Sequence, residues 1–224
     1  MKNKLSFAII GIGRFGTAIA TKLSIEGAEV IAIDSNKDRI NSVKDDVTYS
    51  VVLDSTDINA LKAQNIQEMD AVVVSIGEDF QSLLLTTFAL QELGVKRIMV
   101  RAQGEAQKKI LAKMGIDEIL STEEEVSNNV TKTLMNPSVI LYVPLPDEFE
   151  IIEIKAPKRV IDRSIKDVGL REKYKINLIT LIRKKGEEHH VVGVPEGDTI
   201  IEKDDFILVF GSSKNINRFI EINQ

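Results

Sequence analysis

Residues 11–16 (GIGRFG) match the pattern G-x-G-x-x-G, in which three glycines serve the binding of a phosphate group. The glycines permit a tight turn, the approach of backbone N–H groups to phosphate, and close packing of a helix on a strand. An apolar run precedes the motif and an amphipathic run follows it, so a strand and a helix are expected on its two sides. The start of that helix would favour an anion. The predicted phosphate-binding residues are Gly11, Ile12, Gly13, Arg14, Phe15 and Gly16.

Asp34 stands at the end of the second predicted strand, 21 positions after Gly13. An acidic residue at this place accepts hydrogen bonds from the hydroxyl groups of a ribose. Its negative charge would repel a 2'-phosphate, so the sequence disfavours NADP. The carboxylate does not distinguish NAD from ATP or ADP.

Arg14 bears on that choice, because its guanidinium would emerge beside the phosphate-binding N–H groups. A forked cation suits the terminal phosphate of a nucleotide, and the alternative is a plain surface arginine. Polar residues that follow the second, third and fourth strands are expected at the same edge of the sheet. For two of them simpler roles are open: Thr56 as a helix cap and Gly77 as a turn residue. The further predicted nucleotide-binding residues are Ser35, Asp54, Ser55, Thr56, Ser75, Ile76 and Gly77.

Few residues offer catalytic chemistry. The two histidines, His189 and His190, are adjacent in a stretch that reads as a surface strand, where their side chains would point in opposite directions. The sequence contains no cysteine, no serine-nucleophile elbow and no Walker-type lysine. We therefore predict that the chain is not an enzyme and that the nucleotide is bound without being transformed. An NAD-dependent oxidoreductase remains an alternative, although it would need a proton-transfer group beside the nicotinamide.

The composition is that of a globular protein without a nucleic-acid partner. Of 224 residues, 43% are hydrophobic and 28% charged, and 34 acidic against 29 basic side chains give a net charge of -5. No segment concentrates the basic residues, as phosphate neutralisation along a nucleic acid would require. The apolar runs are far shorter than the ~20 residues that span a bilayer, and the N-terminus lacks a signal-peptide pattern. We expect a cytoplasmic protein without membrane insertion, located in the cytosol or on the inner face of the cell membrane through a membrane partner.

Up to about residue 135, apolar runs rich in valine and isoleucine alternate with helical patterns. Runs without polar alternation suit a parallel sheet that is covered on both faces. Helices are expected over residues 15–26 and 79–93. This order predicts an α/β fold: a Rossmann-like, doubly wound parallel sheet whose ligands bind outside the carboxyl ends of the strands.

The pattern changes after Pro137, which with Pro144 and Pro146 falls in a stretch that reads as an extended connector. Beyond it, short strand-like runs are separated by the turn sequences KKGEEH and PEGD, and a helix is expected at residues 215–222. We predict two domains: a nucleotide-binding domain over residues 1–136 and a small α+β domain over residues 141–224.

Several stretches resemble the cytosolic regulatory subunits of bacterial Ktr potassium-uptake systems, which are RCK (KTN) proteins with TrkA-N and TrkA-C domains. The resemblance covers nearly the whole chain. The stretches that carry it are IIGIGRFGTAIATKL, VIAIDSN, VVVSIGEDFQSLLLTTFALQELGV, VRAQGEAQKKILAKMGIDEILSTEEE and LREKYKINLITLIRKKG.

The resemblance implies an octameric ring bound to a membrane subunit that conducts potassium, with ATP favouring the conducting form and ADP the closed form. It implies that Arg14 reaches the terminal phosphate of ATP and that Arg101 lies near the phosphates. Glu123 would help to hold a divalent cation, magnesium or calcium, at an interface between two subunits. From the sequence alone, Glu123 also fits the start of a helix, where acidic residues are favoured.

The same resemblance implies that the C-terminal domain binds cyclic di-AMP across a dimer interface. Arg171 and Asn177 would supply polar contacts, and Ile161 and Ile176 apolar ones. A nucleotide-sensing domain of another transporter class that binds NAD is a further alternative.

Overall fold

The computed structural model describes residues 4–185 and 188–224. Its backbone contacts divide the chain into two compact units, Met1–Glu124 and Glu125–Gln224. Helix α6 (Thr122–Met135) begins in the first unit and continues in the second. The domain boundary expected between residues 136 and 141 stays a prediction. The turn sequence KKGEEH lies partly outside the described residues.

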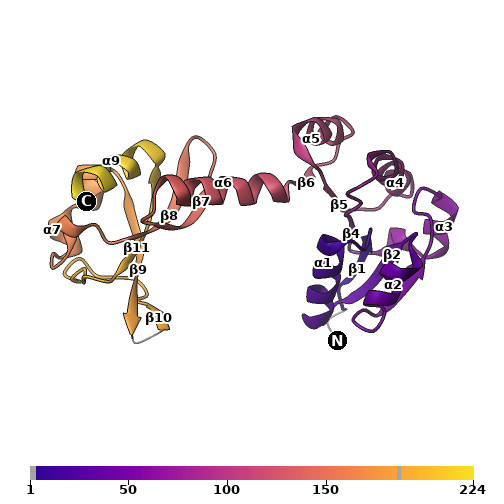
Figure 1. Cartoon of the computed structure of the whole chain (residues 1–224), viewed down its shortest axis with the longest axis horizontal. Coiled ribbons are helices and arrows are strands. Elements are labelled where there is room, and N and C mark those ends of the chain that lie inside the picture. Colours follow the sequence, from indigo (N-terminus) through magenta and orange to yellow (C-terminus); the bar gives the residue numbers. More distant parts are fainter. Residues whose placement is uncertain (1–3, 186–187) are drawn as a thin grey trace. The chain divides into compact units, whose positions relative to one another are not determined.

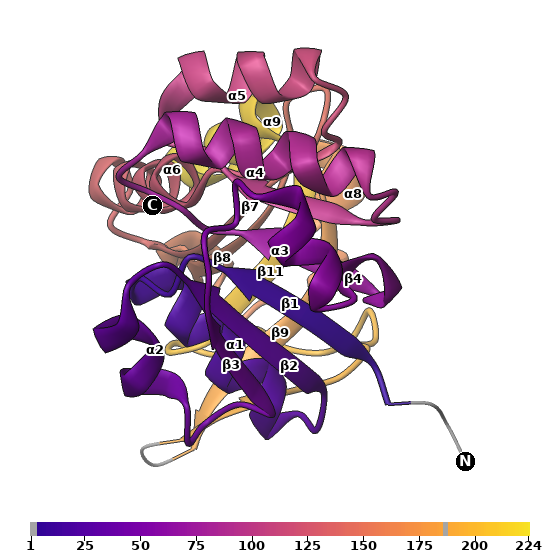
Figure 2. The same ribbon diagram turned by 90° about the vertical axis from the view of Figure 1, so that its right-hand side faces the viewer.

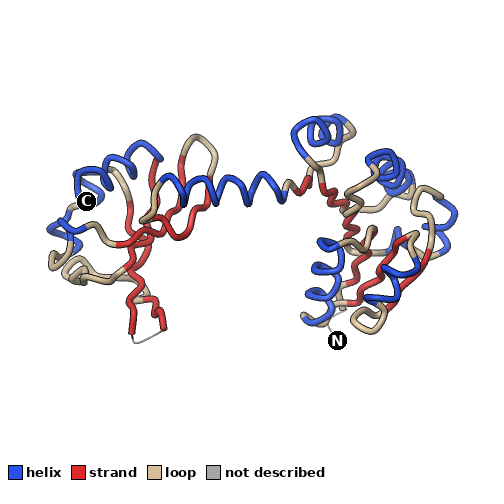
Figure 3. The backbone as a smooth tube through the Cα atoms, in the orientation of Figure 1, coloured by secondary structure: helices blue, strands red, loops and turns tan. Residues whose placement is uncertain are grey.

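The first unit (Figure 1) is built on a parallel sheet of six strands. The strand order is β3-β2-β1-β4-β5-β6. Strands and helices alternate along the chain (Figure 3), and β1, β2 and β3 lie side by side in Figure 2. The order reverses between β1 and β4, which confirms the predicted doubly wound Rossmann-like fold. The strands are β1 (Ser6–Ile10), β2 (Glu29–Asp34), β3 (Tyr49–Val52), β4 (Ala71–Val74), β5 (Ile98–Arg101) and β6 (Glu118–Leu120).

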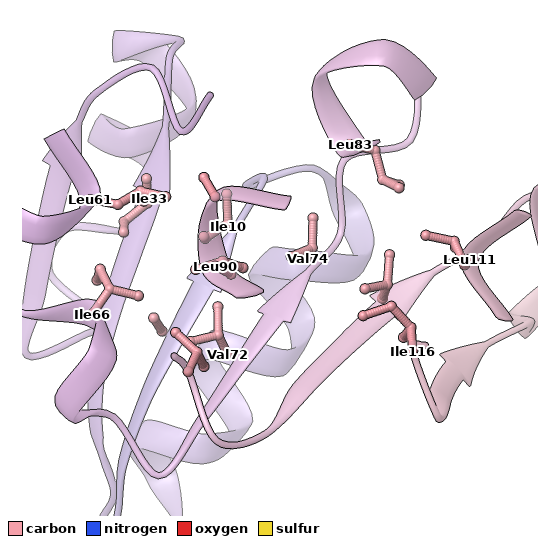
Figure 4. Packing of buried hydrophobic residues seen from close by; sticks show 14 of the residues in the cluster. Ile10, Ile33, Leu61, Ile66, Val72, Val74, Leu83, Leu90, Leu111 and Ile116 are labelled. Atoms are coloured by element: carbon pink, nitrogen blue, oxygen red, sulfur yellow. The ribbon is translucent and has the colours of Figure 1, made fainter. Parts of the chain in front are cut away.

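Both faces of this sheet are buried. Successive residues of a strand point to opposite sides, and both sets of side chains pack in hydrophobic clusters. In β1, Ile10 packs with Leu61, Leu83 and Leu90 of the helices on one face (Figure 4), whereas Ile9 belongs to the separate cluster on the other face. This two-sided burial explains the continuous apolar runs of the sequence. The helices of this unit are α1 (Arg14–Ile25), α2 (Lys37–Val43), α3 (Ile58–Ala63), η1 (Ile66–Glu68), α4 (Phe80–Glu92) and α5 (Gly104–Lys113).

The second unit contains an antiparallel sheet of five strands in the order β10-β9-β11-β8-β7, which confirms the small α+β domain. Its core includes Phe219 and Ile220 of the terminal helix α9. The elements are β7 (Val139–Pro144), β8 (Phe149–Lys155), η2 (Lys158–Val160), α7 (Ile165–Val168), α8 (Leu170–Tyr174), β9 (Asn177–Lys185), β10 (Glu188–Val191), β11 (Phe206–Ser212) and α9 (Ser213–Asn223).

Strand β7 corrects one expectation, because it occupies the proline-containing stretch that was expected to be only a connector. Residues Val139–Pro144 pair with β8, and β7 is an edge strand of the sheet. A proline is tolerated there because an edge strand has one side on which no ladder hydrogen bond is needed. Pro144 forms the last position of the strand, opposite Glu150.

A buried ion pair joins α6 to this sheet. Glu150 of β8 is 0% exposed, and its Oε2 lies 3.0 Å from Nζ of Lys132 in α6. Ser213 donates a hydrogen bond to the same carboxylate at 2.8 Å. Because a buried carboxylate is stable only when it is paired, this cluster fixes the second half of α6 on β8.

Among the described residues, no helix has both the length and the apolar character that crossing a membrane requires.

Candidate nucleotide-binding site

A cavity of about 680 Å³ lies at the carboxyl ends of β1, β2, β4 and β5, where the strand order reverses. Its volume is in the range of small-molecule sites. It collects most of the predicted nucleotide-binding residues from five segments, one at the end of each of strands β1 to β5. Those that line it are Gly11, Gly13, Arg14, Phe15, Asp34, Ser35, Asp54, Ser55, Ser75, Ile76, Gly77 and Arg101.

Glycine is required at two positions of the turn. Gly11 has φ +93°, and a Cβ there would lie 2.9 Å from the backbone nitrogen of Ile76. A Cβ on Gly16 would lie 2.0 Å from the carbonyl oxygen of Gly11, which also accepts a 2.6 Å hydrogen bond from Ser75 Oγ. The turn is therefore locked between β4 and α1, and Gly16 serves packing rather than the cavity surface.

The start of α1 is open to an anion. Gly13 is the N-cap, so no side chain accepts from the first N–H groups, and the first turn contains no acidic residue. Nothing lies within 4 Å of the place that a Cβ on Gly13 would take. The unsatisfied N–H groups and the helix dipole at this end suit a phosphate.

Asp34 ties the turn to β2. It is 6% exposed, and its two carboxylate oxygens accept hydrogen bonds from the backbone N–H of Ile12 (2.7 Å) and of Asn36 (2.8 Å). This contact explains why Ile12 is buried and does not line the cavity. Two carboxylate oxygens offer about four acceptor positions, so capacity remains for ribose hydroxyl groups.

Arg39 of α2 was missed by the sequence interpretation. Its guanidinium lies 3.7 Å from Asp34 and 3.5 Å from Glu78, and all three residues line the cavity. The sequence signal for this contact is that Arg39 follows Asp34 by five residues, in the first turn of the next helix. Asp79, Ser82 and Gln103 also line the cavity without having been predicted.

Residues 54–57 form a local turn at the end of β3. Asp54 accepts hydrogen bonds from the backbone N–H (2.9 Å) and the hydroxyl group (2.7 Å) of Thr56, and these bonds lower the pKa of Asp54. Thr56 does not line the cavity, and it does not cap α3, because Asp57 does so. Ser55 is buried and pairs with Thr86 of α4 at 2.8 Å.

Arg101 at the end of β5 lines the cavity next to the start of α1. Its Cζ lies 5.3 Å from the ring centroid of Phe15, at the start of α1. Its Nη2 donates to Glu123 of α6, and its Nε is buried without a hydrogen-bond partner among the described residues. The structure thus joins two predicted site residues, Arg101 and Glu123, to each other.

Glu123 has the oxygen chemistry that magnesium and calcium prefer, but it stands alone. The part of the chain that the structure describes contains no cluster of three or more metal-ligating side chains. The carboxylate is 59% exposed and holds hydrogen bonds from Arg101 and Thr122. Its pKa is lowered, first by a hydrogen bond from its own backbone N–H and then by those two donors. Among the described residues, Glu123 therefore has no neighbouring side chains that would complete a metal-ligating cluster.

In the second unit, Arg171 and Asn177 contact each other, with Nε of the arginine 2.8 Å from the amide oxygen. Ile176 is 0% exposed, so in this conformation it offers no surface to a ligand. Ile161 lines a different cavity of about 440 Å³, whose rim carries Lys155 and Lys158. The four residues predicted for cyclic di-AMP are thus not gathered in one hollow of this chain.

The histidines lie on β10, as expected for a surface strand. His189 meets the ring of Phe206 edge-on, with centroids 5.5 Å apart, and Nε2 of His190 is 3.7 Å from Glu188.

Comparison with known proteins agrees with this architecture. Residues 7–122 match the TrkA-N domain and residues 149–224 the TrkA-C domain. The chain is 37% identical over 216 residues to Ktr system potassium uptake protein C of Bacillus subtilis, covering 96% of both chains. It is 34% identical to Ktr system potassium uptake protein A of the same organism, covering 98% of this chain and 96% of the relative.

A solved structure, the GsuK channel bound to NAD, shares the fold with a TM-score of 0.53 at 21% identity, over 99% of this chain and 38% of that chain. The present chain thus spans well under half of the channel's length. The match of both domains and the full-length identity to the two Bacillus proteins are decisive. The chain therefore belongs to the family of Ktr potassium uptake proteins built from a TrkA-N and a TrkA-C domain.

Proposed function

We propose that this protein is a cytoplasmic regulatory subunit of a potassium uptake system that senses ATP and ADP in the cavity of its first unit. The observation that carries the proposal is the open start of α1 flanked by two arginines, Arg14 and Arg101. Two forked cations beside unsatisfied backbone N–H groups suit a polyphosphate. The potassium uptake named in both Bacillus relatives supplies the process.

The carboxylates of the cavity favour binding over catalysis. The pKa values of Asp54 and Asp79 are lowered by hydrogen bonds from Thr56 and from Ser82. A general acid near neutral pH needs the opposite shift. We therefore propose a non-enzymatic role in which the ligand changes the state of the protein.

The partner that we propose is a membrane subunit that conducts potassium, contacted by a homo-oligomer of at least two and, by family resemblance, eight chains. A divalent cation would be held by Glu123 together with the nucleotide phosphates, since the chain alone supplies too few ligands. Potassium flux through the paired membrane subunit in vesicles should rise when ATP replaces ADP. Equal flux with both nucleotides would contradict the regulatory role.

Ligand identity is tested by the thermal stability of the purified chain with ATP, ADP, NAD, NADP or cyclic di-AMP. A ligand present at 100 times its Kd stabilises a protein by about 2.7 kcal/mol. We expect ATP and ADP to stabilise, and NADP to fail because Asp34 repels its 2'-phosphate. NAD is included because the GsuK channel of the same fold binds it. Stabilisation by NADP equal to that by ATP would contradict the placement of the ribose at Asp34.

A second candidate function is cyclic di-AMP sensing by the second unit, favoured by the adjacent Arg171 and Asn177. A guanidinium and an amide side by side can bind phosphate and a base edge together. Arg171→Ala should abolish stabilisation by cyclic di-AMP and leave stabilisation by ADP unchanged.

A further inference from the structure

Arg101 forms an ion pair with Glu123 of the same chain, and it also lines the cavity in which a ligand phosphate is proposed to bind. Its side chain is 18% exposed and lies on the cavity wall, with the guanidinium carbon 5.3 Å from the Phe15 ring at the start of α1. The contact to Glu123 uses Nη2, and Nε remains buried without a partner among the described residues. An arginine carries five N–H donors in a fixed fork. The ion pair with Glu123 therefore leaves much of this capacity unused.

Glu123 belongs to the first turn of α6, and the next residue of that turn is paired in the same way. Glu124 Oε2 lies 3.0 Å from Nζ of Lys108 in α5. Two ion pairs thus connect the start of α6 to the nucleotide-binding unit, one through β5 and one through α5. Lys108 does not line the cavity, whereas Arg101 does.

A phosphate at the start of α1 would compete with Glu123 for Arg101. Phe15 already positions the guanidinium at this helix start, so no large movement of Arg101 is needed to meet a phosphate. Phosphate presents more charge and more acceptor oxygens than a carboxylate, and arginine binds it through two donors at once. Because Glu123 is 59% exposed, water readily solvates its carboxylate once Arg101 leaves.

We infer that Glu123 is an internal competitor of the nucleotide phosphate for Arg101, and that phosphate binding releases the first turn of α6. This inference rests on the proposed function of the cavity. It gives the ligand a direct mechanical consequence within one chain, because occupation of the cavity removes the ion pair between Arg101 and Glu123 at the start of α6.

The first test is calorimetric titration of ADP into the full chain with EDTA present, so that no divalent cation contributes. Glu123→Gln should tighten ADP binding about two- to fivefold, which corresponds to the loss of a partly exposed ion pair. Glu124→Gln is the matched control, because it removes the neighbouring carboxylate whose partner lies outside the cavity, and it should leave ADP affinity unchanged.

The second test is hydrogen exchange of the backbone N–H groups of residues 125–129, which are the first in α6 with intrahelical acceptors. In the wild type, exchange should accelerate when ADP is added, and in Glu123→Gln it should be fast without ADP. Unchanged or weaker ADP binding by Glu123→Gln, or exchange that ADP does not alter in the wild type, would overturn the inference while leaving nucleotide binding intact. Absence of ADP binding in the wild type would overturn the proposed function itself.

Discussion

The two cavity arginines beside the start of α1, Arg14 and Arg101, differ in their existing contacts. Arg101 contacts Glu123 and Phe15, whereas Arg14 is exposed and has no hydrogen bond or ion pair to another described residue. Arg14 is the first residue of α1 and lines the cavity at the end of the helix where a phosphate is proposed to bind. This difference supports the proposal that Arg14 meets the terminal phosphate of ATP.

Arg14→Ala should therefore weaken the binding of ATP more than the binding of ADP, because only ATP presents the additional phosphate. A hydrogen bond between charged partners contributes about 1.5–3 kcal/mol, so the preference for ATP over ADP should fall about tenfold or more. Titration of both nucleotides against wild type and variant measures the change. Equal losses for ATP and ADP would mean that Arg14 gives only general attraction to phosphate.

Asp79 provides a pH-dependent contribution to stability. It is the N-cap of α4, and the side chain and backbone N–H of Ser82 donate to it and lower its pKa. A carboxyl whose pKa is lowered on folding stabilises the protein above its unfolded pKa of about 3.9, and this contribution is lost as the pH falls through the folded pKa. Asp79→Ala should lower Tm at pH 7, and the difference should narrow near pH 2.

Asp79→Asn is the control, because an amide oxygen still caps the helix and does not titrate in this range. Its difference from the Ala variant should stay constant with pH. A Tm difference between wild type and Asp79→Ala that is the same at both pH values would contradict the assigned cause.

At the scale of elements, the turn between β1 and α1 separates packing glycines from a binding glycine. Gly16→Ala forces a Cβ onto the Gly11 carbonyl, and overpacking of this kind costs about 1–3 kcal/mol or more. Gly13→Ala meets no atom within 4 Å and has φ -86°, so it should stay within about 1 kcal/mol of wild type. Gly13→Ala should nevertheless weaken the binding of ADP, because its methyl group would stand where the phosphate is proposed to approach. Urea unfolding and ADP titration separate the two effects. A stable Gly16→Ala variant with wild-type binding would contradict the packing role.

The parallel sheet could be predicted because each strand carries its own signal. Ile9 and Ile10 are buried on opposite faces, so the sequence shows an unbroken apolar run, and the glycine motif marks the switch point. The pairing of β7 could not be predicted, because prolines disfavour a strand locally and only the neighbouring β8 supplies the missing partner. Local pattern and tertiary pairing are separate pieces of information.

The candidate site divides in the same way. Gly11, Gly13 and Asp34 follow from the motif and its spacing. The ion pair between Arg101 and Glu123 joins residues 22 positions apart from a strand and a helix, and no local pattern encodes it. The position of Arg39 beside Asp34 and Glu78 likewise depends on how α2 packs on the sheet.

At the scale of the whole molecule, exposed apolar side chains indicate association. Phe88 of α4 is 57% exposed, and Val126, Val130 and Leu134 of α6 are exposed at four-residue spacing, which places them on one face of the helix. Exposed apolar surface of this kind marks an interaction site.

We therefore expect at least a dimer, and an octamer from the family resemblance, in light scattering with ADP present. Val130→Glu should shift the protein towards smaller species without loss of helix content, since its side chain is 51% exposed. An exposed position on the opposite face, tested as Asn128→Glu, is the control. A wild-type monomer in the presence of nucleotide would contradict the regulatory assembly.

The carboxylate of Asp34 has a consequence for attempts to engineer ligand choice. Replacement of this acid by a small neutral residue would remove its repulsion of a 2'-phosphate. In this protein the same carboxylate accepts hydrogen bonds from the N–H groups of Ile12 and Asn36, so its removal leaves two donors without acceptors. Asparagine retains an acceptor for only one of those donors. A variant with altered ligand specificity would therefore also need new acceptors for the N–H groups of Ile12 and Asn36. A single substitution of Asp34 changes ligand choice and the stability of the turn together.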